Sequence, residues 1–204
     1  MDLYVPPQAT TPLPAVLIVA GYPGRFNRME PVIAWAQRIA GAGIIAAAYE
    51  NHDPIAELPK AISELRARAE VDATRIALFA SSGNVALALS ALHGMRCAAL
   101  LYGCMLDLDN RTTSFGFADP KTRFAEIPRD VPLFLARAGR DQFPGINESI
   151  DRFAAASLAA NVPITLVNDP DAAHASDSPH IVRATLRFLQ DHLLDATDAP
   201  STSC

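Results

Sequence analysis

The chain has 204 residues, of which half are hydrophobic and 19% are charged, and its formal net charge is −5. This size favours one domain with a sizeable core and leaves too little chain for two. The negative net charge gives no sign of the basic surface that nucleic-acid-binding proteins need. No apolar run approaches the ~18 residues of a membrane span, and the acidic N-terminus is unlike the basic start of a signal peptide. We therefore expect a single domain that binds neither nucleic acid nor membranes.

Apolar runs and helical periodicities alternate along the chain from residue 15 onward. Short continuous apolar runs are typical of strands buried on both faces, and apolar positions spaced by three or four residues are typical of helices. The predicted strands cover residues 3–5, 15–20, 44–49, 76–80, 97–102, 131–138 and 163–167. The predicted helices cover residues 33–40, 55–69, 85–92, 146–160 and 179–194. This alternation predicts an α/β domain with a mostly parallel central sheet and helices on both faces.

Two segments fall outside this alternation. Residues 103–130 show no clear periodicity, and we predict that they form a minimal lid or pocket excursion containing Met105, Phe115 and Phe117. A satellite hydrophobic cluster is the alternative. The polar tail at 195–204 is expected to be disordered.

The turn between the strand at 76–80 and the following helix is the most informative stretch. Only S-S-G-N, residues 81–84, separates the two elements, so the chain must bend sharply. Alanine and asparagine stand two residues to either side of Ser82, which gives a loosened form of the nucleophile elbow G-x-S-x-G. Centring on Ser81 instead would put Phe79 where the bend needs a small side chain. Ser82 is therefore the better candidate nucleophile.

The residue after Ser82 adds to this interpretation. The backbone N–H of Gly83 opens the helix and points to where an oxyanion would form. The alternative is an ordinary strand-to-helix turn with a serine N-cap.

Polar residues follow the predicted strands, and in a parallel sheet these positions meet at one edge. They include Tyr22, Glu50, Ser82, Asp141 and His174. The chain order serine, aspartate, histidine is that of the α/β-hydrolases. Glu50 could equally line the pocket or form a surface ion pair.

Other acidic residues and a histidine also lie near His174 in the sequence and offer alternative partners for its ring. Asp169 and Asp171 are rival acids, although N-D-P-D is typical of a turn. The spacing of His174, Asp177 and His180 could suggest a metal, but a helix beginning near residue 179 would not hold the three on one face, so we expect no metal site.

Three segments resemble the α/β-hydrolase superfamily, and within it the dienelactone hydrolase-like serine esterases. They are I-A-L-F-A-S-S-G-N, P-L-F-L-A-R-A-G-R-D-Q-F and D-A-A-H-A-S-D, and the similarity covers most of residues 13–192. The resemblance implies Ser82 as nucleophile, Asp141 as triad acid and His174 as base. It also implies an oxyanion hole formed by the N–H groups of Gly83 and Tyr22.

The sequence departs from dienelactone hydrolases proper at three places. Those enzymes use a cysteine where this chain has Ser82, and a glutamate where it has Gly21. Their substrate-binding arginines have no clear match. The resemblance thus implies the fold and the triad, and only weakly implies dienelactone as substrate.

The expected activity is a serine hydrolase that cleaves short-chain carboxylic esters through an acyl-enzyme, without a cofactor. A lactonase or acyltransferase with the same triad, and a non-catalytic ligand-binding protein, are the alternatives. The partner is then a small-molecule ester, and a homodimer is compatible with the sequence. Cys97, Cys104 and Cys204 show no metal or redox spacing, so we expect reduced thiols in a cytoplasmic protein.

Overall fold

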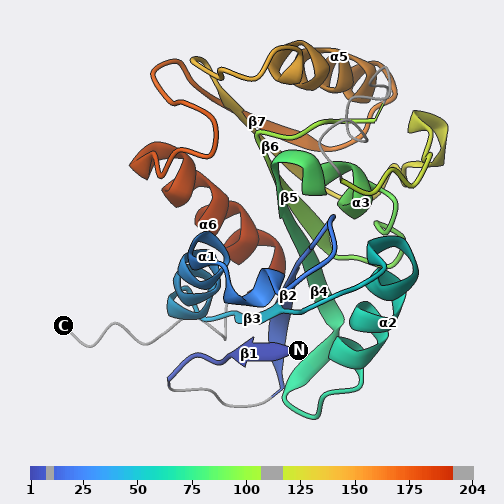
Figure 1. The fold of residues 1–204 in the computed structure, drawn as a ribbon, viewed down its shortest axis with the longest axis vertical. Helices are drawn as coiled ribbons and strands as arrows, with labels where there is room; N and C mark the ends of the chain where they lie inside the picture. Colours follow the sequence, from blue (N-terminus) through green and yellow to red (C-terminus); the bar gives the residue numbers. More distant parts are fainter. Residues whose placement is uncertain (8–11, 107–116, 195–204) are drawn as a thin grey trace.

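The computed structural model describes residues 1–7, 12–106 and 117–194 (Figure 1). The strands are β1 Asp2–Tyr4, β2 Leu13–Ile18, β3 Ile45–Ala48, β4 Val71–Ser81, β5 Cys97–Leu101, β6 Leu133–Ala138 and β7 Ile164–Asp169. The α-helices are α1 Glu30–Gly41, α2 Pro54–Arg66, α3 Val85–Leu89, α5 Ile146–Ala159 and α6 Pro179–Leu193. Short 3-10 turns cover Phe26–Arg28, Ser82–Asn84 and Phe124–Glu126.

Within the described residues, seven strands form one sheet in the order β1-β3-β2-β4-β5-β6-β7. β1 runs antiparallel to β3, and the other neighbouring strands are parallel. Figure 1 shows α1 and α6 on one side of the sheet and α2 and α3 on the other. The predicted mostly parallel sheet with helices on both faces is confirmed.

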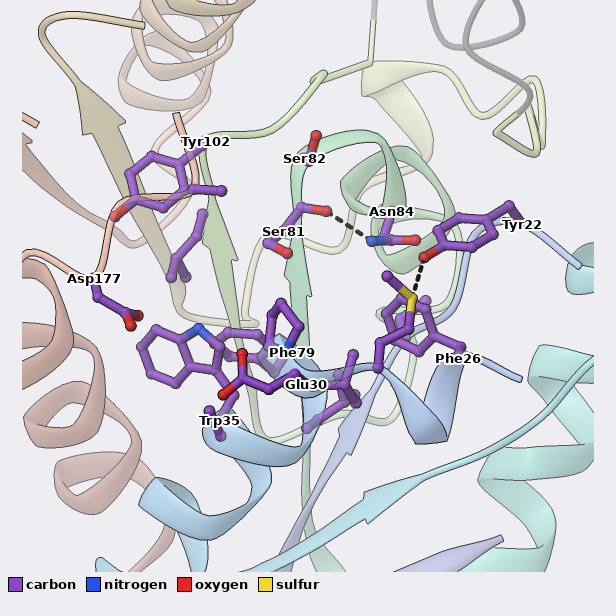
Figure 2. A pocket seen from close by; sticks show the side chains of 18 of the residues that line it. Tyr22, Phe26, Glu30, Trp35, Phe79, Ser81, Ser82, Asn84, Tyr102 and Asp177 are labelled. Carbon is purple, nitrogen blue, oxygen red and sulfur yellow. Dashed lines mark hydrogen bonds between the residues drawn. The ribbon is translucent and has the colours of Figure 1, made fainter. Parts of the chain in front are cut away.

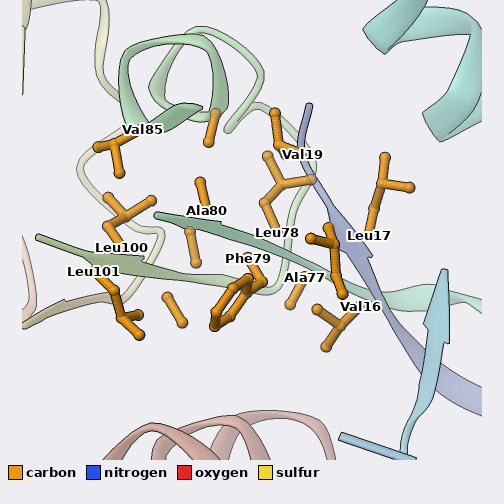
Figure 3. Close-up of a cluster of buried hydrophobic side chains, with 14 of the residues drawn as sticks. Val16, Leu17, Val19, Ala77, Leu78, Phe79, Ala80, Val85, Leu100 and Leu101 are labelled. Atoms are coloured by element: carbon orange, nitrogen blue, oxygen red, sulfur yellow. The ribbon is translucent and has the colours of Figure 1, made fainter. Parts of the chain in front are cut away.

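The central strands form the core of the domain (Figure 3). Every residue of β2, β3 and β5 is buried, as expected for parallel strands covered on both faces. Phe79 in β4 is 2% exposed and packs its ring 4.7 Å from that of Trp35 in α1. This packing fixes α1 against the strand that leads to Ser82.

The edge of the sheet differs from the prediction. β7 has only β6 as a neighbour, and its residues are exposed or half-buried, with Leu166 44% exposed. The strand also continues to Asp169, so Asn168 and Asp169 belong to it and do not follow it.

The helix after β4 also differs, because a 3-10 turn precedes it and it ends at Leu89. Of the predicted lid, residues 103–106 and 117–130 are described and contain one 3-10 turn, at Phe124–Glu126. The prediction for the tail at 195–204 lies outside the described residues.

Cys97 and Cys104 are buried and form no disulfide with each other, whereas Cys204 lies outside the described residues. Burial raises the pKa of the Cys97 thiol to about 12, so this side chain stays protonated and acts as a small core residue. Among the helices of the described segments, none combines the length and the apolar character needed to cross a membrane.

Candidate active site

The chain bends at Ser82, directly after β4. Ser82 adopts φ of +57°, in the left-handed region that a residue with a side chain rarely occupies. Such strain is sustained only where the surrounding structure fixes it, and here β4 and the following 3-10 turn hold both sides of the bend. The Ser82 Oγ lies 2.9 Å from Nε2 of His174.

The second nitrogen of the same imidazole meets an aspartate. His174 Nδ1 lies 2.7 Å from Oδ2 of Asp141, and the side chains of His174 and Asp141 are only 8% and 1% exposed. A carboxylate accepts hydrogen bonds, so it favours the tautomer with the proton on Nδ1 and leaves the Nε2 lone pair facing the serine. The structure thus brings together three groups that are 92 and 33 residues apart in sequence.

Two neighbouring loops hold this histidine in place. The Asp141 carboxylate also accepts a bond from the Phe143 N–H at 2.9 Å, and the Phe143 ring packs edge-on against the imidazole with centroids 4.7 Å apart. The His174 N–H donates to the Gln142 side chain at 3.2 Å. On the other side, the Tyr102 hydroxyl donates to the carbonyl of Ser176 at 3.0 Å.

The loop that follows His174 is also tied to α1. Arg38 donates two hydrogen bonds to the Asp177 carboxylate, at 2.8 and 3.1 Å. These bonds hold the pKa of Asp177 below its usual range. Arg38 also lies over the Trp35 ring, 5.4 Å from its centroid.

The rival acids have other partners. Asp169 accepts hydrogen bonds from the Ser178 hydroxyl and the Asp171 N–H, and Asp171 pairs with Arg140 at 2.6 Å. Across residues 1–7, 12–106 and 117–194, no group of three histidine, cysteine, aspartate or glutamate side chains is arranged to hold a metal ion.

The loop after β2 is connected to the elbow by Asn84. The Gly21 N–H donates to Asn84 Oδ1 at 2.7 Å, and Asn84 Nδ2 donates to the carbonyl of Ser81 at 2.9 Å. A Cβ on Gly21 would lie 3.0 Å from the Asn84 Cα, so a side chain at position 21 would be crowded. The predicted oxyanion donor Tyr22 is therefore adjacent to a backbone position that the elbow itself fixes.

Phe117 packs against Gly83, the residue that carries the other predicted oxyanion donor. A Cβ on Gly83 would lie 2.2–2.5 Å from atoms of the Phe117 ring, which shows how closely this ring approaches the backbone. The same ring makes an edge-on contact with Tyr22, with centroids 5.2 Å apart. The Ala118 N–H donates to the carbonyl of Gly21 at 2.6 Å and holds this segment beside the loop after β2.

A cavity of about 270 Å³ opens beside the elbow (Figure 2). It runs from Ser82 to the rings of Trp35 and Phe79, between the loop after β2 and the loop after His174. Of the four predicted pocket residues, Phe117 lines this cavity.

The other three predicted pocket residues lie elsewhere. Glu50 is outside the described lining and pairs with Arg25 at 3.8 Å, which is the surface alternative. Met105 is 1% exposed and belongs to the core, and Phe115 lies outside the described residues. Trp35 also lines the cavity, which the sequence does not predict, because the helical spacing of Trp35 indicates only a core-facing position.

Comparisons with known proteins concern the fold. No family model matches the chain, and no curated protein sequence matches it. A bacterial heroin esterase superposes with a TM-score of 0.71 at 17% identity, over 95% of this chain and 79% of that one. Thermogutta terrifontis esterase 2 phosphorylated by paraoxon superposes with a TM-score of 0.70 at 19% identity, over 95% of this chain and 89% of that one. A protein from Klebsiella pneumoniae assigned as a dienelactone hydrolase superposes with a TM-score of 0.67 at 19% identity, over 93% of this chain and 90% of that one. The chain therefore has the α/β-hydrolase fold, as its sequence predicts.

Proposed function

We propose that the chain is a serine hydrolase that cleaves carboxylic esters of small acids through an acyl-enzyme intermediate. Ser82 is the nucleophile, His174 the general base and acid, and Asp141 the group that orients the imidazole. The observation that carries this proposal is the continuous contact from Ser82 Oγ to His174 Nε2 at 2.9 Å and from His174 Nδ1 to Asp141 Oδ2 at 2.7 Å.

The first half of the reaction forms the acyl-enzyme. A serine hydroxyl is a weak nucleophile, so His174 takes its proton as Ser82 Oγ attacks the ester carbonyl carbon. The carbonyl oxygen gains the negative charge, and Asp141 stabilises the imidazolium. When the tetrahedral intermediate collapses, the C–O bond to the alcohol breaks and the leaving oxygen takes the proton from His174 Nε2.

The second half regenerates the enzyme. Water attacks the acyl carbon and gives its proton to His174, which returns it to Ser82 as the carboxylic acid leaves. In both tetrahedral intermediates the N–H groups of Gly83 and Tyr22 donate to the oxyanion. Loss of one such donor typically costs about 3 kcal/mol of barrier. The tie between Gly21 and Asn84 supports this assignment, because it fixes the loop that carries Tyr22 relative to the elbow.

The cavity limits the size of the substrate. At about 270 Å³ it is smaller than the roughly 300–1,000 Å³ of pockets for drug-sized ligands, so it suits esters of short or otherwise small acids and not long-chain lipids. The relatives in structure support an esterase: one is a heroin esterase, and another is an esterase phosphorylated by paraoxon.

The proposal is tested by hydrolysis of p-nitrophenyl butyrate by the native chain and by Ser82→Ala and Ser81→Ala. Ser82→Ala should lose activity by about four to six orders of magnitude, because no nucleophile remains. Ser81→Ala should keep far more activity than Ser82→Ala. Comparable activity of Ser82→Ala and the native chain would contradict the proposal, provided both show the same circular dichroism spectrum.

A further inference from the structure

Aromatic side chains that the proposed chemistry does not use form the walls of the cavity beside Ser82. Trp35 and Phe79 line the end of the cavity away from the elbow, with ring centroids 4.7 Å apart and planes tilted by 43° (Figure 2). Nearer the elbow, Tyr22 contacts both Phe26 and Phe117 edge-on, with centroids 5.5 and 5.2 Å apart. All five side chains line the same space.

From this arrangement we propose that the cavity binds the acyl part of the ester, and that the preferred acyl group is uncharged and carries a single aromatic ring. The inference rests on the proposed function and names its substrate class. It goes beyond a small acid in general, because it specifies the ring, the absence of charge and the side of the ester that enters the cavity.

The size of the cavity supports one ring. An apolar protein cavity of about 150 Å³ accepts benzene, and the space beside Ser82 is about 270 Å³. A phenylacetyl group therefore fits with its linking carbon, whereas an acetyl group leaves most of the aromatic wall without a partner. Aromatic rings also favour the edge-to-face contacts that Tyr22, Phe26 and Phe117 already make with one another.

The position of His174 decides which part of the ester enters. The leaving oxygen must come within reach of His174 Nε2, so the alcohol part departs on the side of the imidazole. The His174 ring is not among the described side chains that line the cavity, whereas Ser82 and Tyr22 are. The Phe143 ring contacts the imidazole edge-on and is likewise not among the described side chains that line the cavity. The acyl group is the part that extends from the carbonyl toward Trp35.

Charge in the cavity excludes acids with a second carboxylate. The described lining contains two carboxylates, Glu30 and Asp177, and no lysine, arginine or histidine. Asp177 is already paired with Arg38. A carboxylate on the acyl group would find no cationic side chain in the described lining to pair with and would lie in the same space as Glu30, and burying a carboxylate unpaired is costly. This agrees with the missing match to the arginines by which dienelactone hydrolases hold a substrate carboxylate.

Trp35 makes a test possible that does not depend on turnover. It is the one tryptophan of the chain, so tryptophan fluorescence reports on the part of the cavity that Trp35 lines. The Ser82→Ala variant is titrated with ethyl phenylacetate, ethyl acetate and monoethyl succinate. We expect a saturable fluorescence change with ethyl phenylacetate. The concentration of ethyl phenylacetate that gives half of this change should be at least about tenfold below the corresponding concentration of either of the other two esters. Equal responses to all three esters, or no response to ethyl phenylacetate, would overturn the inference.

A variant that fills the cavity provides the matched control. Ala34 lines the cavity on α1, and Ala34→Leu should abolish the response to ethyl phenylacetate. Ala155→Leu makes the same change at an exposed position on α5 and should leave the response as it is. Thermal melts show whether both variants fold, and an unchanged response in a folded Ala34→Leu variant would contradict the assigned cavity.

The two proposals fail in different ways. The native chain is assayed with p-nitrophenyl acetate and p-nitrophenyl phenylacetate. The value of kcat/KM for each ester is divided by the rate constant for hydrolysis of that ester by hydroxide. This ratio should be about tenfold or more higher for the phenylacetate. Hydrolysis with no such preference would overturn the acyl-group inference and leave the esterase proposal standing. Saturable binding in the Ser82→Ala variant without hydrolysis by the native chain would overturn the esterase proposal and support the cavity assignment.

Discussion

Asn84 Oδ1 accepts a hydrogen bond of 2.7 Å from the Gly21 N–H, across 63 residues of sequence. Both residues depart from the pattern of the enzymes that the sequence resembles, which have glycine two residues after the nucleophile and, in dienelactone hydrolases, glutamate before the first oxyanion donor. The two departures are in contact. Asn84 fills the space beside the loop after β2, and the absence of a side chain at position 21 makes room for it.

Replacing Asn84 by leucine should affect both stability and the oxyanion hole. The Gly21 N–H and the Ser81 carbonyl would each lose a buried partner, so the free energy of unfolding should fall by about 1–3 kcal/mol. A loop that holds Tyr22 less firmly should lower kcat by about tenfold to a hundredfold with little change in KM. Urea unfolding and steady-state kinetics measure the two effects.

The matched control for Asn84→Leu is Thr185→Val, which removes a buried hydrogen bond of 2.8 Å to the Ile181 carbonyl on α6. It should lower stability and leave kcat unchanged. Equal kinetic effects of the two substitutions would show that Asn84 acts only through stability.

Arg38→Met should lower kcat but change the free energy of unfolding only slightly. The bonds to Asp177 tie the loop that carries His174 to α1, but the side chains of Arg38 and Asp177 are 31% and 69% exposed. Exposed ion pairs stabilise proteins by less than about 1 kcal/mol, so the change in stability should be small. We expect kcat to fall several-fold. Arg187→Met removes a pair on α6 and should not change kcat, so an equal kcat in the two variants would remove Arg38 from the positioning of the loop.

Ester hydrolysis should rise with pH. Only a neutral imidazole can accept the proton of Ser82, because a protonated ring has no lone pair left on Nε2. The rate of p-nitrophenyl butyrate hydrolysis, corrected for the uncatalysed rate, should therefore increase from acidic pH and then level off. A rate that does not change with pH would contradict the role of His174 as base.

Asp72 provides a prediction about stability at low pH. Its carboxylate accepts hydrogen bonds from the hydroxyl and the N–H of Thr74 and from Arg75, which lower its pKa to about 2 from an ordinary 3.8. A lowered pKa in the folded state stabilises the fold fully above the unfolded value, near pH 4, and this contribution is lost as the pH falls toward 2. Asp72→Asn should lower the free energy of unfolding by about 1–2 kcal/mol at pH 7. This is less than the full pKa shift would give, because solvent screens the partly exposed side chain.

The difference between Asp72→Asn and the native chain should narrow between about pH 4 and 2, measured by urea unfolding at several pH values. Asp191→Asn, at an exposed ion pair, is the control. A difference that stays constant over this range would mean that the charge of Asp72 does not carry the effect.

The sequence predicts the order of strands and helices because buried parallel strands are continuous apolar runs with polar residues at their ends. It also selects Ser82 over Ser81, and the contact between Ser82 and His174 agrees with that choice. The exposure of β7 could not be predicted, since Ile164–Val167 is as apolar as the central strands and its place at the edge depends on pairing order.

The cavity is harder to predict than the triad. Its described walls come from β2, β4, β5, α1 and the loop segments that carry Tyr22, Tyr102, Phe117 and Asp177. Each aromatic residue taken alone looks like an ordinary core residue. The pair of Arg38 and Asp177 spans 139 residues, and no local pattern indicates it. By contrast, the site groups Ser82, Asp141 and His174 each follow a strand, so one rule about sheet edges brings them together.

Covalent labelling by a fluorophosphonate, followed by proteolysis and mass spectrometry of the modified peptide, tests whether Ser82 is a nucleophile activated by His174. We expect one phosphonyl group on Ser82, with labelling strongly reduced in His174→Ala because the serine then lacks its base. A phosphonyl group on Ser81 would contradict these roles, as would labelling of Ser82 at an equal rate in the native chain and the His174→Ala variant.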